Sequence, residues 1–326
     1  MIRRGLAIAA AFAAAGAASI AAAEPARTAP GKAHDAGGVS EHAQFNFAPV
    51  GPGFKQLAID NPLGDVRIEG YDGAAIQIET IKHAPDDETI DRLRVSVVPG
   101  SDGVVRIGTA AESGRERKHV TRGAVRVDLV IHAPRAARID ATVAAGKLEL
   151  VNMDGGGELD TASGAIVVRN VAGELWTHSV SGTMSLTQVF GSVDAASVAS
   201  DLDLDSIGGE KLVASVDRGK IAGRRVHSQL VELTSTDGAI QLEADAALHG
   251  RVTVSSLRGN VAVRLHRHGM IDARVRAPTA ELAGQRLSPG ADGWAHAEIG
   301  HAQAGEAASM VELASRFGVV QLVVLD

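Results

Sequence analysis

The segment Leu159-Asp-Thr-Ala-Ser-Gly-Ala-Ile-Val-Val168 contains one copy of the pattern that decides the fold. Its glycine, Gly164, belongs to a series in which a glycine, or once a serine, recurs every 18 to 21 residues. The members of the series, called anchors below, are Gly146, Gly164, Gly182, Ser200, Gly219, Gly238 and Gly259. A fixed period of this size is typical of proteins in which each repeat buries its apolar face only against its neighbours.

Apolar residues keep fixed places around each anchor. In the copy at Gly164 they lie two, four and seven positions later, at Ile166, Val168 and Val171. In the other copies a polar or small residue separates the first two of these positions. Similar alternation precedes the anchor. This pattern predicts two short strands per repeat, each with one buried face. The sequence therefore predicts an all-β parallel β-solenoid, or β-helix, with about 18–19 residues per turn.

The same template occurs twice outside the main array, over residues 57–68 around Gly64 and over residues 311–322 around Gly318. Strand-like sequence between about 90 and 135 predicts antiparallel excursion strands near the N-terminus. The segment 266–300 is less regular. We therefore expect one β-solenoid domain over 45–326, with its regular array at about 137–265.

The first 23 residues have the composition of a signal peptide. Arg3 and Arg4 precede an alanine-rich apolar run, and Ala21-Ala22-Ala23 fits the small-residue cleavage rule. Residues 24–44 are rich in Pro, Gly and Ala without apolar periodicity and predict a flexible leader. We expect an exported chain, periplasmic or secreted to the cell surface, with no integral membrane segment after signal cleavage.

The composition disfavours nucleic acid as a partner. Without Arg3 and Arg4 the chain has 30 basic and 39 acidic residues, and only nine residues are aromatic. Phosphate binding needs Lys and Arg in excess, and base stacking needs aromatic side chains. The chain also has no cysteine, so a disulfide framework is excluded.

The chain resembles the bacterial putative-adhesin family of β-strand-repeat domains, a group of uncharacterised function. The resemblance rests on the opening Asn61-Pro-Leu-Gly-Asp-Val-Arg-Ile68, on the Ser-Gly pairs at 163–164 and 181–182, and on repeats such as 159–168. It covers roughly residues 50–326. It implies a right-handed solenoid in the cell envelope and supplies no catalytic residue.

Two outward-facing groups are candidate sites. Asp201, Asp203 and Asp205 alternate along one strand and could bind a hard cation such as calcium; the alternative is a solvated acidic face partly paired with Arg224. Trp176 could stack on a sugar ring as a recognition residue. It shares one outward column, six positions before the anchors, with Asp140, Glu158, Asp194 and Glu232.

These observations favour a non-enzymatic structural or recognition module of the bacterial cell envelope, without catalytic residues, cofactor or metal. Its partner would be an envelope protein or a glycan. One alternative is a carbohydrate-active enzyme, a polysaccharide lyase or glycosidase, on the same scaffold. A second is a self-assembling envelope scaffold. Val319-Val-Gln-Leu-Val-Val-Leu325 is apolar on both faces, so this strand is either buried under a cap or an open edge that recruits another chain.

Overall fold

The computed structural model describes residues 26–27, 31–35, 38–47, 53–112, 125–300 and 308–325. Within these residues the protein is nearly all-β, with one large mixed sheet whose strands pair mostly in parallel. The predicted signal peptide at 1–23 lies outside the described residues. The helix in the described part, α1 (Asp87–Ile90), has four residues, and no helix there is long and apolar enough to cross a membrane.

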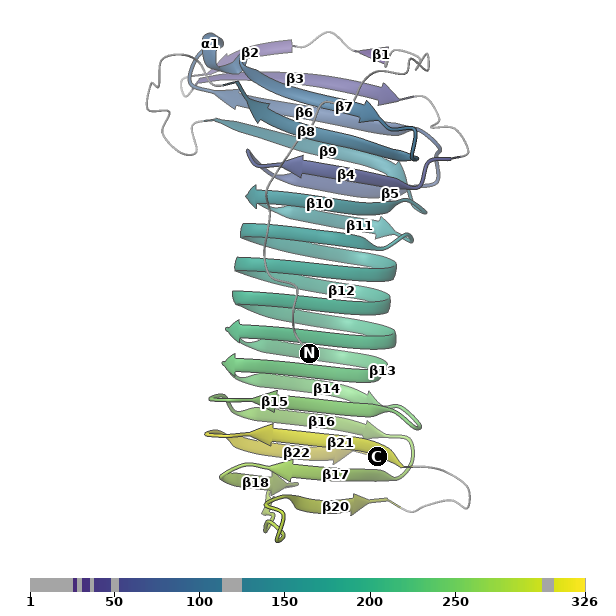
Figure 1. Ribbon diagram of the computed structural model, residues 1–326, viewed down its shortest axis with the longest axis vertical. Helices are drawn as coiled ribbons and strands as arrows, with labels where there is room; N and C mark the ends of the chain where they lie inside the picture. Colours follow the sequence, from purple (N-terminus) through teal and green to yellow (C-terminus); the bar gives the residue numbers. More distant parts are fainter. Residues whose placement is uncertain are drawn as a thin grey trace.

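The middle of the molecule is a stack of turns that we call rungs, each made of one strand before and one strand after an anchor (Figure 1). Its strands are β10 (Arg138–Ala145), β11 (Leu148–Met153), β12 (Gly157–Arg218), β13 (Ile221–Asp237), β14 (Ile240–Ala246), β15 (Arg251–Ser256) and β16 (Val261–Arg267). Pairing is parallel, and the register equals the anchor spacing: Ile139 faces Gly157, Leu202 faces Ile221 and Ile240 faces Val261. Residues one repeat apart therefore become neighbours in space.

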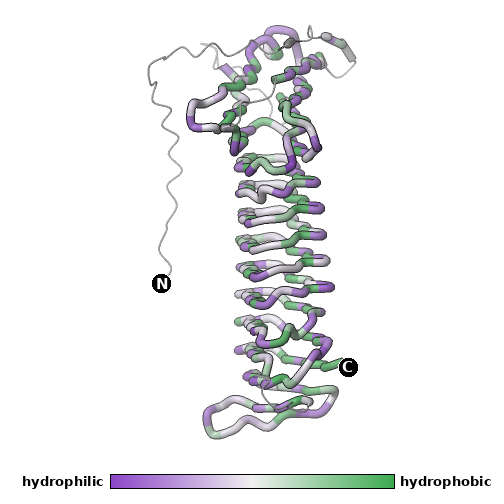
Figure 2. Tube along the Cα trace, turned by 90° about the vertical axis from the view of Figure 1, so that its right-hand side faces the viewer, coloured by the Kyte–Doolittle hydropathy of each residue, from purple (hydrophilic) through white to green (hydrophobic). Residues whose placement is uncertain are grey.

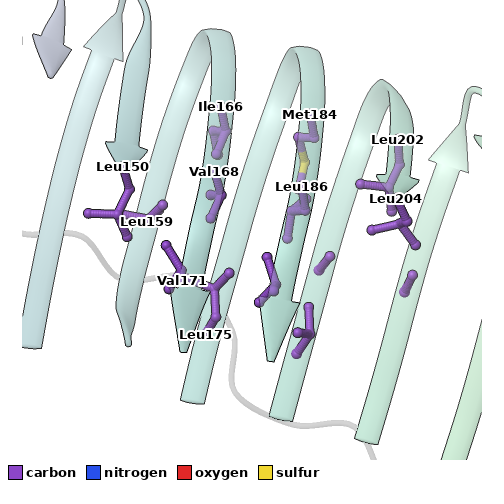
Figure 3. Close-up of a cluster of buried hydrophobic side chains, with 14 of the residues drawn as sticks. Leu150, Leu159, Ile166, Val168, Val171, Leu175, Met184, Leu186, Leu202 and Leu204 are labelled. Carbon is purple, nitrogen blue, oxygen red and sulfur yellow. The ribbon is translucent and has the colours of Figure 1, made fainter. Parts of the chain in front are cut away.

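The core is a column of apolar side chains inside this stack. The residues two and four positions after an anchor are at most 2 % exposed in the first four rungs. They are Leu148, Leu150, Ile166, Val168, Met184, Leu186, Leu202 and Leu204. Figure 3 shows those from Leu150 to Leu204 on successive turns, together with Leu159, Val171 and Leu175. Each such burial stabilises the fold by roughly 1.5–3 kcal/mol. Figure 2 shows hydrophobic and hydrophilic residues alternating along the stacked turns.

The anchors are glycine because the rungs approach one another most closely there. A Cβ atom added to an anchor glycine would lie 1.7 to 2.6 Å from the carbonyl oxygen of the anchor in the rung before it, and contacts below 3.0 Å are essentially never seen. This contact with the preceding anchor recurs at Gly146, Gly164, Gly182, Gly219, Gly238, Gly259 and Gly318. Ser200 is the exception; it is buried, and its Oγ donates to Ser179 Oγ at 3.3 Å.

The two outlying copies of the template form rungs that are inserted out of chain order. The first comprises β4 (Gln56–Asn61) and β5 (Val66–Tyr71). On one side β4 and β5 pair with β10 and β11, and on the other with β8 (Val104–Ala111) and β9 (Arg126–Pro134). This rung is tied to the array by Glu149, which is almost buried and lies about 3 Å from three cations. They are Arg67 (3.0 Å), Lys147 (2.8 Å) and Arg169 (3.1 Å).

The second inserted rung comprises β21 (Ser309–Ser315) and β22 (Val319–Leu325). These strands pair in parallel with β15 and β16 on one side. On the other side they pair with β17 (Ile271–Arg276) and β18 (Thr279–Leu282). The alternative of an open edge does not hold at Val319–Leu322, because this part of β22 pairs with β18 on the side away from β16. The irregular segment 266–300 contains a further rung, and it ends in β19 (Gln285–Arg286) and β20 (Ala295–Ile299).

The N-terminal end is covered by longer strands. β3 (Gly38–Phe47) pairs antiparallel with β6 (Ile76–Ala84), and β6 pairs antiparallel with β9. Two short strands, β1 (Ala26–Arg27) and β2 (Gly31–Asp35), also pair with β3. The flexible leader predicted for 24–44 is thus a strand from Gly38 onward, because Val39, Ala43 and Phe45 are buried in alternation. Glu41 on the same face forms an ion pair with Lys82 at 2.7 Å.

A hairpin completes this end of the stack. It is formed by β7 (Leu93–Pro99), which pairs antiparallel with β8. The excursion strands expected at about 90–135 correspond to β7, β8 and β9. The strands of the hairpin are inclined relative to the rungs (Figure 1).

Candidate functional site

A groove of about 840 Å³ lies where the β7–β8 hairpin meets the first rungs. The side chains that line the groove point outward from paired strands, and the strand register places them in two neighbouring rows. Along one row Val98 faces Arg106, which faces Ala58, then Asp140, then Glu158. The neighbouring row runs through Ser96, Gly108, Asp60, Thr142 and Asp160. The groove is therefore a concave part of one sheet face, built by β7, β8, β4, β10 and β12.

Small residues form the floor of this groove. Ala58, Gly108 and Ala110 lie at outward positions between larger neighbours, and the inward residues between them, such as Ile59 and Ile107, are buried in the core. A short side chain between two rows of long ones leaves space above the sheet. The hollow thus follows from side-chain size at a few positions of an otherwise regular face.

Four carboxylates line one side of the groove. Asp60 and Glu158 make no ion pair or side-chain hydrogen bond with another described residue. Asp140 Oδ2 accepts a hydrogen bond from Gln56 Nε2, and its Oδ1, shielded from solvent, lies 3.2 Å from Arg138 Nε without completing a hydrogen bond.

Asp160 is the carboxylate with a perturbed acidity. Burial raises the pKa of Asp160 above its usual value, and the neighbouring charge of Asp140 raises it further. His178 in the next rung, whose Nδ1 lies 3.4 Å from Asp160 Oδ1, acts in the opposite direction on this pKa. A carboxyl group whose ionised form is disfavoured by burial gains from an added cation or hydrogen-bond donor.

The two arginines on the hairpin side already have partners. Arg94 Nε donates to Glu112 Oε1 at 2.8 Å, and Arg106 Nη2 donates to Asp102 Oδ2 at 2.7 Å. The hydrogen bond from Arg106 lowers the pKa of Asp102 to about 2. The groove therefore contains neutralised arginines on one side and incompletely paired carboxylates on the other.

Trp176, the recognition residue predicted from the sequence, lies just beyond the groove. In the structure Asp140 lies opposite Glu158, as the predicted column requires. Trp176 follows Glu158 by one repeat of 18 residues. Its side chain is 48 % exposed, and the neighbouring His178 reaches back to Asp160. Trp176 is thus an accessible aromatic surface next to the carboxylates.

The other predicted candidate, Asp201 with Asp203 and Asp205, lies elsewhere on the surface, and each carboxylate has a partner. Asp201 Oδ1 accepts from Lys220 N at 2.8 Å, Arg224 Nη2 lies 3.0 Å from Asp203, and Arg225 pairs with Asp205. Within the described residues no group of three or more His, Cys, Asp or Glu side chains has a geometry that could hold a metal ion. Arg224, the residue expected to pair with part of this acidic face, pairs with Asp203.

The hairpin contribution to the groove was not predicted. The signal available in the sequence was the run of small residues at Gly108 and Ala110 at alternate positions of a strand-like segment. Placing that segment beside Asp60 requires the pairing of β8 with β4, which no local pattern specifies.

Comparison with known proteins gives structural neighbours only. No protein-family model and no curated protein sequence matches the chain. Among solved structures, it is similar to a putative adhesin from Bacteroides fragilis NCTC 9343, with 10 % identity, a TM-score of 0.37, and 87 % of this chain and 97 % of that chain covered.

A putative adhesin from Parabacteroides merdae ATCC 43184 has 11 % identity and a TM-score of 0.31, with 87 % and 95 % covered. A putative cell adhesion protein from Clostridium sporogenes ATCC 15579 has 9 % identity and a TM-score of 0.26, with 88 % and 100 % covered. These solved structures are described as putative adhesins or as a putative cell adhesion protein, and the family that the sequence resembles has a similar description.

Proposed function

We propose that this chain is a right-handed β-solenoid, exported to the cell envelope, that recognises an envelope component through the groove at its N-terminal end and catalyses no reaction. The observation that carries the proposal is the groove of about 840 Å³ on the outer face of β7, β8, β4, β10 and β12. A concave site with an apolar floor and a few polar groups is the usual form of a ligand site.

The solenoid architecture is supported by the register. Parallel strands one repeat apart pair along the stack, and the anchor column keeps successive turns in contact. Connections between parallel strands of one sheet are right-handed in nearly all proteins, which favours the right-handed form. Export is supported by the composition of residues 1–23.

A first experiment tests recognition. The purified mature chain is mixed with isolated cell envelopes of the producing bacterium, and the bound fraction is measured after sedimentation. Ala58→Leu fills the groove floor with a larger apolar side chain, and Val180→Leu makes a similar change on an exposed strand position outside the groove. We expect Ala58→Leu to abolish binding and Val180→Leu to leave it intact, with both variants retaining the wild-type melting temperature within a few degrees. Equal binding by the two variants would contradict the proposal that the groove binds the envelope component.

A second experiment tests export. Mass spectrometry of the chain recovered from cell fractions should show loss of residues 1–23 and enrichment outside the cytoplasm. An uncleaved chain confined to the cytoplasm would contradict the envelope role.

An enzymatic role has one specific observation in its favour. Asp160, whose pKa is raised by burial, lies beside further carboxylates, and such pairs perform acid–base chemistry in glycosidases. This alternative predicts that incubation with envelope polysaccharide releases soluble reducing ends, and that Asp160→Asn and Glu158→Gln abolish the release. Binding without any release favours the recognition role.

A further inference from the structure

We propose that the groove binds a lysine side chain of an extended basic peptide, with the aliphatic stem on the small-residue floor and the ammonium group among the carboxylates of β4, β10 and β12. This inference rests on the proposed function, because it names the ligand of the same groove.

The first step is the charge inside the groove. Asp60, Asp140, Glu158 and Asp160 line one side, and the arginines of the opposite side are held by Glu112 and Asp102. The groove therefore contains carboxylate oxygens that can accept further hydrogen bonds, whereas both of its arginines are already paired. A ligand that supplies positive charge and hydrogen-bond donors complements it, whereas an anionic ligand would meet the carboxylates with repulsion.

The second step is the spacing of the acceptors. Carboxylates in one column of adjacent rungs, such as Asp140 and Glu158, project from strands about 4.8 Å apart. An ammonium group has three donors and no acceptor, so it can engage more than one of these carboxylates at once. An ammonium group beside the partly buried Asp160 is favourable, because it compensates the charge of the carboxylate that burial disfavours.

The third step is the apolar part of the ligand. Ala58, Gly108 and Ala110 offer a shallow apolar floor, and Val98 forms part of its wall. Lysine packs its methylene stem on apolar surface and keeps its ammonium group at a polar rim. The groove offers both, because its apolar floor lies beside the carboxylates. Trp176, half exposed and one rung beyond Glu158, adds an aromatic face of the kind that attracts cations.

An extended peptide fits better than an isolated amine because the groove is an open part of a sheet face. A peptide with lysine at alternate positions places successive lysines on one side, at about 6.6–7 Å intervals. One lysine would occupy the floor at Ala58, and a second would reach Glu158 and the face of Trp176.

The test is isothermal titration calorimetry of the mature chain with an acetylated, amidated Ala-Lys-Ala-Lys-Ala peptide at low ionic strength. The matched control peptide has norleucine in place of both lysines, which keeps the stem and removes the charge. We expect saturable binding of the lysine peptide only, weakened about tenfold by Glu158→Gln and by Asp160→Asn, since each change removes a charged acceptor of the ammonium group. A tenfold loss of affinity corresponds to about 1.4 kcal/mol. Spermine serves as a small-amine arm: binding as tight as that of the peptide would replace the peptide with a free polyamine and overturn the proposal.

Asp203→Asn is the control for general electrostatic attraction, because Asp203 belongs to an acidic patch outside the groove. We expect it to change the affinity by less than about twofold, as exposed charges contribute little. Equal weakening by Asp203→Asn and Glu158→Gln, or equal binding of the norleucine peptide, would overturn the proposal.

The envelope-binding experiment separates this proposal from the function on which it rests. If Ala58→Leu abolishes envelope binding and the lysine peptide does not bind, the groove recognises another ligand and only the lysine assignment fails. If the peptide binds in the groove and envelope binding does not depend on Ala58, the assignment stands and the proposed function fails.

Discussion

Replacing one anchor glycine by alanine should destabilise the stack far more than alanine does at other glycines. Gly182 has a φ of 134°, and a Cβ atom there would lie 1.7 Å from the carbonyl oxygen of Gly164. To reach the 3.0 Å below which such contacts are essentially unknown, the two rungs must move apart by more than 1 Å. Strand hydrogen bonds hold them about 4.8 Å apart, so this movement breaks or stretches several bonds on both sides.

We therefore expect Gly182→Ala to lower the free energy of unfolding by about 3–5 kcal/mol, within the range of severe backbone and packing lesions. The measurement is urea unfolding followed by circular dichroism. Amide hydrogen exchange shows where the stack is destabilised. We expect faster exchange mainly in the rungs around Gly164 and Gly182, because each rung contacts only its neighbours.

Two matched variants isolate the cause. Gly293 also has a positive φ, 78°, but a Cβ there would meet no atom within 4 Å. Gly293→Ala should therefore cost only the backbone term of roughly 1–2 kcal/mol. Ser200→Gly, in the rung that already accommodates a side chain at the anchor, should change stability by less than about 1 kcal/mol. Equal destabilisation by Gly182→Ala and Gly293→Ala would refute the close-approach argument.

Four further predictions follow from individual contacts. Thr177 is buried and its Oγ1 has no hydrogen-bond partner among the described residues, so Thr177→Val should stabilise the fold by about 1 kcal/mol in urea unfolding, and a loss of stability would contradict the assignment. Glu149→Gln removes the charge shared by three cations and should cost about 2–4 kcal/mol, with Glu158→Gln as an exposed control that changes little. Because the folded-state pKa of Asp160 is raised above 3.8, its contribution to stability is complete below pH 3.8 and is lost as pH rises through the raised value; Asp160→Asn should flatten this part of the stability–pH curve, and an unchanged slope would contradict it. Deleting residues 309–326 removes the rung between β15–β16 and β17–β18, and the remaining chain should aggregate on light scattering where the full chain does not.

The rungs could be predicted from the sequence because their cause is local and repeated. The anchor glycine recurs in every turn of the regular array except the one with Ser200, and apolar residues follow it at the same spacing, so each copy supports the others. The isolated copies at Gly64 and Gly318 also form rungs of the same column. Their insertion out of chain order was not predictable. It depends on which strands lie on either side, and residues 57–68 carry no signal that distinguishes β8 from β10 as a neighbour.

The candidate site was only partly predictable for a related reason. Asp140, Glu158 and Trp176 could be aligned in one column because the repeat fixes their register. Arg94, Arg106 and Gly108 come from a non-repetitive hairpin, and only tertiary pairing brings them to the same face. The leader prediction failed at β3 because a few buried residues, Val39, Ala43 and Phe45, suffice when β6 offers a complete partner strand.

The inserted rung of β21 and β22 has a consequence for the order in which the molecule can be assembled. Residues 309–325 are synthesised after the strands on both of their sides, yet they lie between them. The rung of β17 and β18 cannot take its final place by simple addition to β16; it must wait for later residues or be displaced by them. Growth of the stack from its N-terminal side therefore stops at β16 until residues 309–325 arrive. The last section of the fold can form only after the segment up to Leu325 is available, because β17 and β18 pair with β21 and β22.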